Sequence, residues 1–139
     1  MDRHSGAAGY RAVRRPEDGE HVGYLLVDAC EPPCVIPCDL LGIPLAGAMR
    51  EADAERLLVL DGLAAVAEPF EALLPPVLGA DVDPTAAQPG WTWRRVLVIE
   101  VGPSRAVLRP ENPAPAEAGC TVEVAIPADE LLHRARPRR

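Results

Sequence analysis

The chain has 139 residues, a length that fits one domain, and 48% of them are apolar, which excludes a disordered chain as the description of its middle part. Its net charge is −7 at pH 7, and an acidic body repels phosphate, so we expect no binding to duplex nucleic acid. No apolar run approaches the ~20 residues of a membrane helix, and no apolar leader is visible. We therefore expect a cytoplasmic protein with reduced cysteines and no membrane partner.

The basic residues gather near the two ends of the chain. Residues 1–15 and 134–139 contain eight of the fourteen arginines and one acidic residue, so the negative charge belongs to the middle. Residues 1–20 also lack an apolar period. We expect a flexible N-terminal arm over residues 1–20, a single globular domain over residues 21–133 and a basic tail over residues 134–139.

Two strands separated by a proline turn are expected at the start of this domain. Val22–Asp28 has apolar residues on both faces, as a central strand does. Val35–Leu41 follows a turn that contains Pro32 and Pro33, which cannot donate hydrogen bonds to a strand ladder. Pro37 lies inside this second strand and therefore indicates an edge position or a bulge.

The spacing of apolar residues predicts one helix over Arg50–Asp61. Ala54, Leu57 and Leu58 recur at i, i+3 and i+4, which is the period of one helix face. Gly62 is the residue type that most commonly ends a helix in a left-handed conformation. We therefore place the end of the helix just before it.

The rest of the chain is predicted to be mainly strands. Leu63–Glu68 is expected to be a strand, which extends to Leu74 in one alternative. Pro75–Gly90 is rich in proline and glycine and is expected to be a long loop. The strongest predicted strand is Trp91–Val101, and a Gly-Pro-Ser turn joins it to a hairpin partner at Arg105–Arg109.

The last predicted elements complete the fold class. Cys120–Ile126 alternates apolar and polar residues, as a half-buried strand does, and Ala128–His133 is expected to form a short helical turn. About six strands and one helix favour a mainly β (α+β) fold. A small antiparallel curled sheet and an SH3-like barrel both fit these elements, and both alternatives stay open.

Three of the four cysteines lie close together and are weak candidates for metal ligands. Cys30, Cys34 and Cys38 fall within nine residues, and Cys120 is distant. Their spacing differs from the Cys-x2-Cys pattern that is typical of zinc sites, so we expect no metal and no cofactor. A zinc or thiol protein, and a disulfide between Cys30 and Cys34, stay open as alternatives.

Trp91, Trp93 and Arg95 are the candidate binding residues. Alternate residues of a strand share one face, so the three side chains are expected to lie together. Tryptophan and arginine are enriched at protein interfaces. A tryptophan in a small β domain can equally be part of the core, and that interpretation stays open.

These observations favour a non-catalytic protein-interaction or accessory domain with a protein partner. An alternative is a small-ligand-binding protein or an enzyme with a site near the Trp91–Val101 strand and the Pro75–Gly90 loop. An enzyme is the less favoured interpretation, because His4, His21 and His133 have no serine or cysteine at a spacing that indicates a catalytic triad.

Several short strings run through the chain in a recognisable order. They are Gly23-Tyr24-Leu25, Val35-Ile36-Pro37, Leu41-Gly42-Ile43-Pro44-Leu45, Gly62-Leu63-Ala64, Ala67-Glu68, Trp93-Arg94-Arg95-Val96 and Ile99-Glu100-Val101. Their order resembles that in short uncharacterised proteins of GC-rich bacteria. The resemblance implies a bacterial source and no particular activity.

Overall fold

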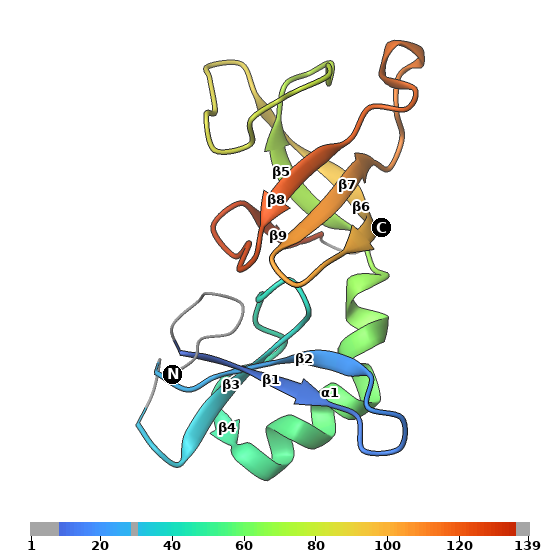
Figure 1. The fold of residues 1–139 in the computed structure, drawn as a ribbon. Helices are drawn as coiled ribbons and strands as arrows, with labels where there is room; N and C mark the ends of the chain where they lie inside the picture. Colours follow the sequence, from blue (N-terminus) through green and yellow to red (C-terminus); the bar gives the residue numbers. More distant parts are fainter. Residues whose placement is uncertain (1–8, 29–30, 136–139) are drawn as a thin grey trace. The chain divides into compact units, whose positions relative to one another are not determined.

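The computed structural model describes residues 9–28 and 31–135, and the chain divides into two compact units, residues 1–66 and residues 67–139 (Figure 1). Both units are built mainly of antiparallel strands, and the described residues contain one α-helix. This confirms the expected mainly β class, with two sheets. The expected single domain over residues 21–133 stays a prediction, because two compact units can still unfold together.

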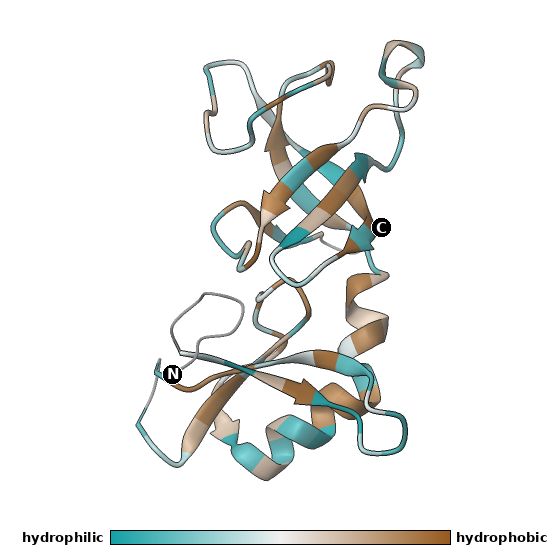
Figure 2. Cartoon of the chain, in the orientation of Figure 1, coloured by the Kyte–Doolittle hydropathy of each residue, from teal (hydrophilic) through white to brown (hydrophobic). Residues whose placement is uncertain are grey.

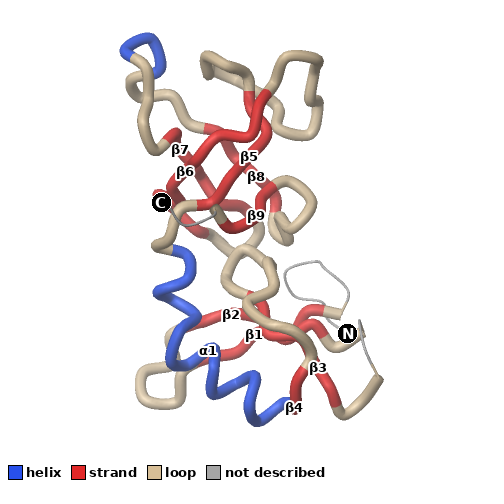
Figure 3. Tube along the Cα trace, turned by 180° about the vertical axis from the view of Figure 1, so that it is seen from behind, coloured by secondary structure: helices blue, strands red, loops and turns tan. Residues whose placement is uncertain are grey.

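The first unit is a four-stranded antiparallel sheet with the helix on one face. Its strands neighbour one another in chain order: β1 (Tyr10–Arg14), β2 (His21–Leu26), β3 (Cys34–Cys38) and β4 (Met49–Arg50). The helix α1 (Glu51–Val66) follows β4 directly and lies across the sheet, behind it in Figure 1 and in front of it in Figure 3. Buried residues recur along one side of α1, from Ala54 through Leu58 to Ala65, which explains why this side packs on the sheet.

Aliphatic side chains from the sheet and the helix form the core of this unit. The core cluster consists of Val13, Val22, Leu25, Val35, Ala54 and Leu58. Charged residues of α1 such as Glu51, Asp53, Glu55 and Arg56 are exposed, and Figure 2 shows them as hydrophilic stretches of the helix. The unit is thus a two-layer arrangement with one apolar interface between helix and sheet.

Residues 10–14, which the sequence placed in a flexible arm, instead form the strand β1. Their antiparallel pairing with β2 continues through a bulge after Val13. Val13 is 7% exposed in the core, and the Tyr10 ring lies edge-on to Tyr24 with centroids 6.0 Å apart. Val13 and Tyr10 thus contribute apolar contacts to the unit. The sequence did not reveal these contacts, because a five-residue segment is too short to show a repeated apolar pattern. Residues 1–8 of the expected arm lie outside the described residues.

The helix continues to Val66, beyond its predicted end at Asp61, so the prediction of a strand over Leu63–Glu68 is wrong. Gly62, which was expected to end the helix, lies inside it and is buried. The physical reason is a close approach between helix and sheet. A Cβ at Gly62 would lie 2.2 Å from the carbonyl oxygen of Val22 in β2. The glycine therefore serves helix–sheet packing rather than a left-handed turn.

The second unit is a five-stranded antiparallel sheet that curls into a half-barrel. Its strands are β5 (Phe70–Leu74), β6 (Thr92–Val101), β7 (Arg105–Pro110), β8 (Val122–Ala125) and β9 (Leu132–Arg134), and their spatial order is β8-β7-β6-β5-β9. The middle strand β6 pairs with β7, which confirms the predicted hairpin.

The C-terminal end of this unit differs from the prediction. The expected helical turn over Ala128–His133 is a turn followed by the strand β9. The N–H groups of Leu131 and Leu132 both donate to the carbonyl oxygen of Ala128, and the chain then extends. It extends because Leu132 is buried opposite Ala72 of β5, which draws this segment into the sheet. The tail predicted over residues 134–139 begins in β9, and residues 136–139 lie outside the described part.

Alternation along the strands gives the curled sheet an apolar inner face and a mixed outer face (Figure 2). The inner face includes Phe70, Ala72 and Leu74 of β5, Val96 of β6, Ala106 and Leu108 of β7, and Val122 and Val124 of β8, all buried. Charged and aromatic side chains, among them Glu71, Trp93 and Arg95, occupy the outer face. The candidate binding residues therefore lie on the second unit and outside its core.

We expect Gly62→Ala to lower the free energy of unfolding of the first unit by about 1–3 kcal/mol, because the added methyl group forces α1 away from β2. Gly47→Ala is the matched control, since a Cβ at Gly47 meets no atom within 4 Å. Urea titration of both variants measures the effect. Equal stabilities would contradict the close approach of helix and sheet.

The same titration tests whether the chain unfolds as one domain. Both tyrosines, Tyr10 and Tyr24, belong to the first unit, and both tryptophans, Trp91 and Trp93, belong to the second. Tyrosine and tryptophan emission therefore report on the two units separately. A single cooperative domain requires both signals to shift together in Gly62→Ala, whereas a shift of the tyrosine signal alone would show independent units.

Candidate functional site

The outer face of the five-stranded sheet carries an aromatic pair, Trp93 and His133. In the sheet, β5 lies between β6 and β9, so the two side chains come from strands that are not neighbours. Their ring centroids are nevertheless 4.5 Å apart, with 40° between the ring planes. The rings therefore meet over β5, where Leu73 is the register partner of Trp93 and Glu71 is that of His133.

A hydrogen bond to Glu71 orients the His133 side of this pair. His133 Nε2 lies 2.8 Å from Glu71 Oε1, and the two residues are direct cross-strand partners. This bond orients the imidazole that contacts the indole. Trp93 remains 50% exposed despite this contact. The indole therefore offers a large apolar surface with one polar N–H group.

The structure separates the three predicted binding residues. Trp93 and Arg95 share the outer face of β6, as expected for alternate residues of a strand. The Arg95 Nε–H donates to Glu111 Oε1 at 2.7 Å, so its charge is engaged within the chain. Trp91 precedes β6 and is half-buried, and its backbone N–H donates to the carbonyl oxygen of Gln88 at 3.2 Å. Trp93 is therefore the member of the set that presents an open aromatic surface.

An apolar hollow of about 210 Å³ opens beside Trp93. Its lining includes Ala72, Leu74, Leu108, Val122 and Val124 of the inner face, and Pro84, Thr85 and Ala87 of the long loop. Leu73, Trp93, Glu130 and Leu131 also line it. The loop and the tryptophan strand, which the sequence associated with an alternative ligand site, thus border one cavity.

A buried ion pair connects two long loops of this unit, residues 75–91 and 111–121, to β6. The side chain of Glu117, at the end of a 3-10 helix (Pro115–Glu117), has no solvent exposure. Its carboxylate accepts hydrogen bonds from both terminal nitrogens of Arg94, at 2.6 and 2.8 Å. Arg94 also donates to the carbonyl oxygen of Pro75 at 3.1 Å. A carboxylate buried this deeply is tolerated because it is both paired and hydrogen-bonded.

Backbone amides also donate hydrogen bonds to Glu117. Its carboxylate also accepts hydrogen bonds from the N–H groups of Leu78 and Ala114, one in each loop. The Arg94 hydrogen bond is the largest cause that lowers the pKa of Glu117 to about 2, and the two backbone hydrogen bonds add to it. The group is therefore ionised at neutral pH and acts as a structural tie.

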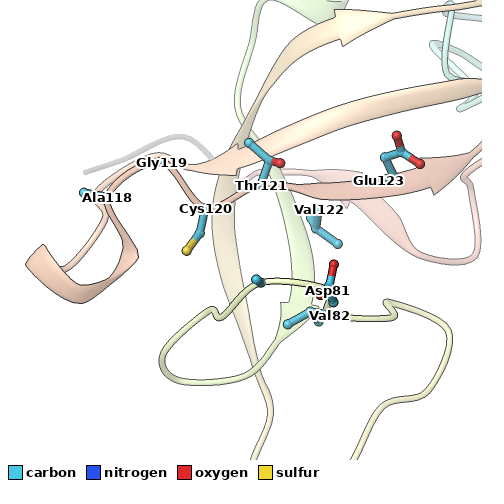
Figure 4. Close-up of a pocket in the computed structure, with 9 residues that line it drawn as sticks. Asp81, Val82, Ala118, Gly119, Cys120, Thr121, Val122 and Glu123 are labelled. Carbon is cyan, nitrogen blue, oxygen red and sulfur yellow. The ribbon is translucent and has the colours of Figure 1, made fainter.

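A second and more polar hollow, of about 540 Å³, lies between residues 80–82 and the start of β8 (Figure 4). Asp81 and Val82 lie across from Val122, whereas the Glu123 carboxylate points to the other side of the strand. Cys120 also lines this hollow. A cysteine nucleophile needs a base within hydrogen-bond reach, and the described lining contains no histidine, so we assign no catalysis to it.

The cysteine candidates are distributed over both units. Cys34 and Cys38 lie in β3, where the Cys38 Sγ is 3.7 Å from the carbonyl oxygen of Ile36, and Cys120 belongs to the second unit. Cys30 lies outside the described residues. Within the described ranges, no group of three or more His, Cys, Asp or Glu side chains is arranged to hold a metal ion.

Sequence reasoning missed His133, Glu71 and Glu117 as parts of this region. His133 comes to Trp93 only through the pairing of β9 with β5, which a segment predicted as helical could not indicate. Glu117 lies in a loop without an apolar period, and its partner Arg94 is distant in sequence. A clean alternation in β5, where Phe70, Ala72 and Leu74 are buried, is the one local signal for the outer position of Glu71.

Comparison of the chain with protein-family models, with curated proteins and with solved structures found no match. Among the described residues, the helix is too short or too polar to cross a membrane.

We expect the stability of the second unit to fall as the pH drops from about 4.5 to about 2. Glu117 has an ordinary pKa of 4.5 and a folded-state pKa of about 2. Its contribution is complete above the higher value and is lost as acid protonates the folded carboxyl group. Glu117→Gln should flatten this dependence and lower the stability at neutral pH by about 3 kcal/mol, because Arg94 loses its counter-charge. Tryptophan emission during urea unfolding at several pH values measures both effects.

Glu123→Gln is the control for this experiment. Glu123 also pairs with an arginine, Arg105, but both side chains are more than half exposed. An exposed pair contributes at most about 1 kcal/mol, so this variant should keep the acid dependence of the parent. An acid dependence that persists undiminished in Glu117→Gln would show that another group is responsible.

Proposed function

We propose that this protein is a non-catalytic interaction domain that binds another protein through the outer face of its five-stranded sheet. The observation that carries the proposal is Trp93, whose indole is half exposed and yet rests on the ring of His133. We call the surface formed by Trp93, His133, Glu71 and Leu73 the Trp93 face.

Preorganisation of Trp93 would favour binding. A side chain that is held before binding loses little conformational entropy on binding. Tryptophan is also among the residues that most commonly dominate the binding energy of protein interfaces. Trp93 combines both properties, because cross-strand contacts fix its position while much of its ring stays open to a partner.

The charges around the Trp93 face favour a protein partner over a phosphate-rich one. The carboxylate of Glu71 is hydrogen-bonded to His133, and the charge of Arg95 is paired with that of Glu111. Phosphate recognition needs cations that are available to the ligand, whereas a protein contact is favoured by apolar surface with few uncompensated charges. A depression of about 410 Å³ beside Trp93 has room for a side chain of the partner.

We expect Trp93→Ala to weaken binding of the partner about 30-fold or more, the effect of removing one dominant interface residue. The partner is first identified by capture on the immobilised full-length chain, and its dissociation constant is then measured with the purified proteins. Trp91→Ala is the matched control, because Trp91 is half-buried outside the Trp93 face and its loss should leave binding near the parent value.

Both variants must show the same tryptophan-independent unfolding transition as the parent chain before binding is compared. Retention of the partner by a folded Trp93→Ala chain would refute the proposed contact surface. Binding of duplex DNA that weakens steeply with salt would identify a nucleic-acid partner instead.

A second candidate function is the binding of a small apolar molecule, and the hollow beside Trp93 favours it. Its volume of about 210 Å³ exceeds the ~150 Å³ of an engineered apolar cavity that binds benzene. Its lining is mostly aliphatic, and Thr85 and Glu130 stand at the rim. The chemistry suits an uncharged, single-ring compound.

We expect toluene to raise the unfolding temperature of the chain in proportion to its binding, as a ligand of the folded state does. Ala72→Leu places extra carbons in the hollow and should abolish the rise. Ala125→Leu makes the same change at an exposed position of β8 and should leave the rise intact. A rise of equal size in Ala72→Leu would show that toluene binds elsewhere.

A further inference from the structure

The strand β1 forms one edge of the four-stranded sheet, and no other strand of the described residues lies beyond it. The backbone N–H of Val27 donates to the carbonyl oxygen of Gly9 at 2.8 Å, which sets the alternation along β1. Residues of an antiparallel strand alternately direct their backbone groups toward and away from their partner strand. The N–H and C=O groups of Ala12 therefore point away from β2. Such an edge is a template for another strand.

A hollow of about 420 Å³ lies between this edge and α1. Its strand side includes Ala12, Val13 and Arg14, and its helix side includes Glu55, Val59 and Leu60. Leu60 is 72% exposed, the most open of the large apolar side chains in the described residues. Apolar carbons and unsatisfied backbone groups thus border the same hollow, which is the combination that an extended peptide requires.

The edge is positively charged. Residues 10–15 contain Arg11, Arg14 and Arg15 and no acidic residue. Arg11 and Arg15 each pair with a carboxylate of the chain, whereas Arg14 donates to the carbonyl oxygen of Gly19 at 3.1 Å. The charge of Arg14 is therefore available to an acidic ligand.

We propose that β1 binds an extended segment of another protein as an additional strand, and that this segment alternates apolar and acidic side chains. Its backbone pairs with Ala12, an apolar side chain enters the hollow against Val59 and Leu60, and an acidic side chain meets Arg14. Main-chain hydrogen bonds supply affinity and alternate side chains supply specificity in this mode of binding. The surface belongs to the first unit and does not depend on the function proposed for the Trp93 face.

A short, blocked, dye-labelled peptide of alternating valine and glutamate is the probe, and fluorescence anisotropy with the full-length chain measures its binding. We expect binding that weakens about tenfold or more when alternate peptide nitrogens on the pairing edge carry methyl groups, because strand hydrogen bonds are then lost. A peptide with lysine in place of glutamate should bind more weakly as well.

Two variants of the protein locate the site. Ala12→Pro removes the outward N–H without removing a hydrogen bond to β2, and it should abolish binding. Arg14→Glu should weaken binding about fivefold, because an exposed ion pair is replaced by a repulsion. Arg105→Glu makes the same charge change on the second unit and should bind like the parent. If Ala12→Pro fails to fold, Arg14→Glu and the methylated peptide still decide the matter.

Amide hydrogen exchange gives an independent readout, because the Ala12 amide should become protected when the peptide binds. Equal binding of the methylated peptide would overturn the proposal. So would a peptide that perturbs tryptophan emission and leaves Ala12 unprotected, since it would then bind the second unit. Self-association of the chain that is lost in Ala12→Pro would show that a second copy occupies the edge.

Discussion

The pairing of a fully buried carboxylate, Glu117, with the guanidinium of Arg94 decides where the two long loops of the second unit lie. Neither loop has a regular strand or an extended helix to hold it, and each instead gives a backbone N–H to the same carboxylate. Burying one charge alone would cost several kcal/mol, so both loops must reach their positions together for the pair to be stable. The apolar hollow and the polar hollow are lined by residues of these loops, and their shapes follow from this pair.

The two surfaces that we propose for binding, one on each unit, differ in physical origin. The Trp93 face is formed by side chains. The indole of Trp93 in β6 contacts the ring of His133 in β9 across the strand β5. The edge of β1 is formed by backbone groups. The amide and carbonyl of Ala12 point outward, beside a hollow that Leu60 also lines. Side-chain surfaces select a shape, and strand edges select an extended conformation.

How well the sequence predicted each element depended on where that element's contacts lie. The hairpin of β6 and β7 was predicted because its alternation and its turn are local, and it forms the middle of the sheet. The end of α1 was misplaced because glycine commonly ends a helix. In this chain Gly62 instead allows the backbone of Val22 to approach the helix closely. Trp93 was predicted to be a binding residue from its residue type and from strand alternation. Its support by His133 was not, since that contact depends on the pairing of β9 with β5.

The sequence by itself determined the mainly β class, the hairpin of β6 and β7 and the placing of Trp93 and Arg95 on one face of β6, because residue type and a period of two act over a few neighbouring residues. Tertiary structure alone decided the recruitment of Tyr10–Arg14 as a strand, the burial of Glu117 and the meeting of Trp93 with His133. Each of these depends on contacts between residues far apart in the chain. A local sequence pattern does not specify which distant residue will pair with a charge, with a strand or with an aromatic ring. These partners are therefore determined only when the sheets assemble.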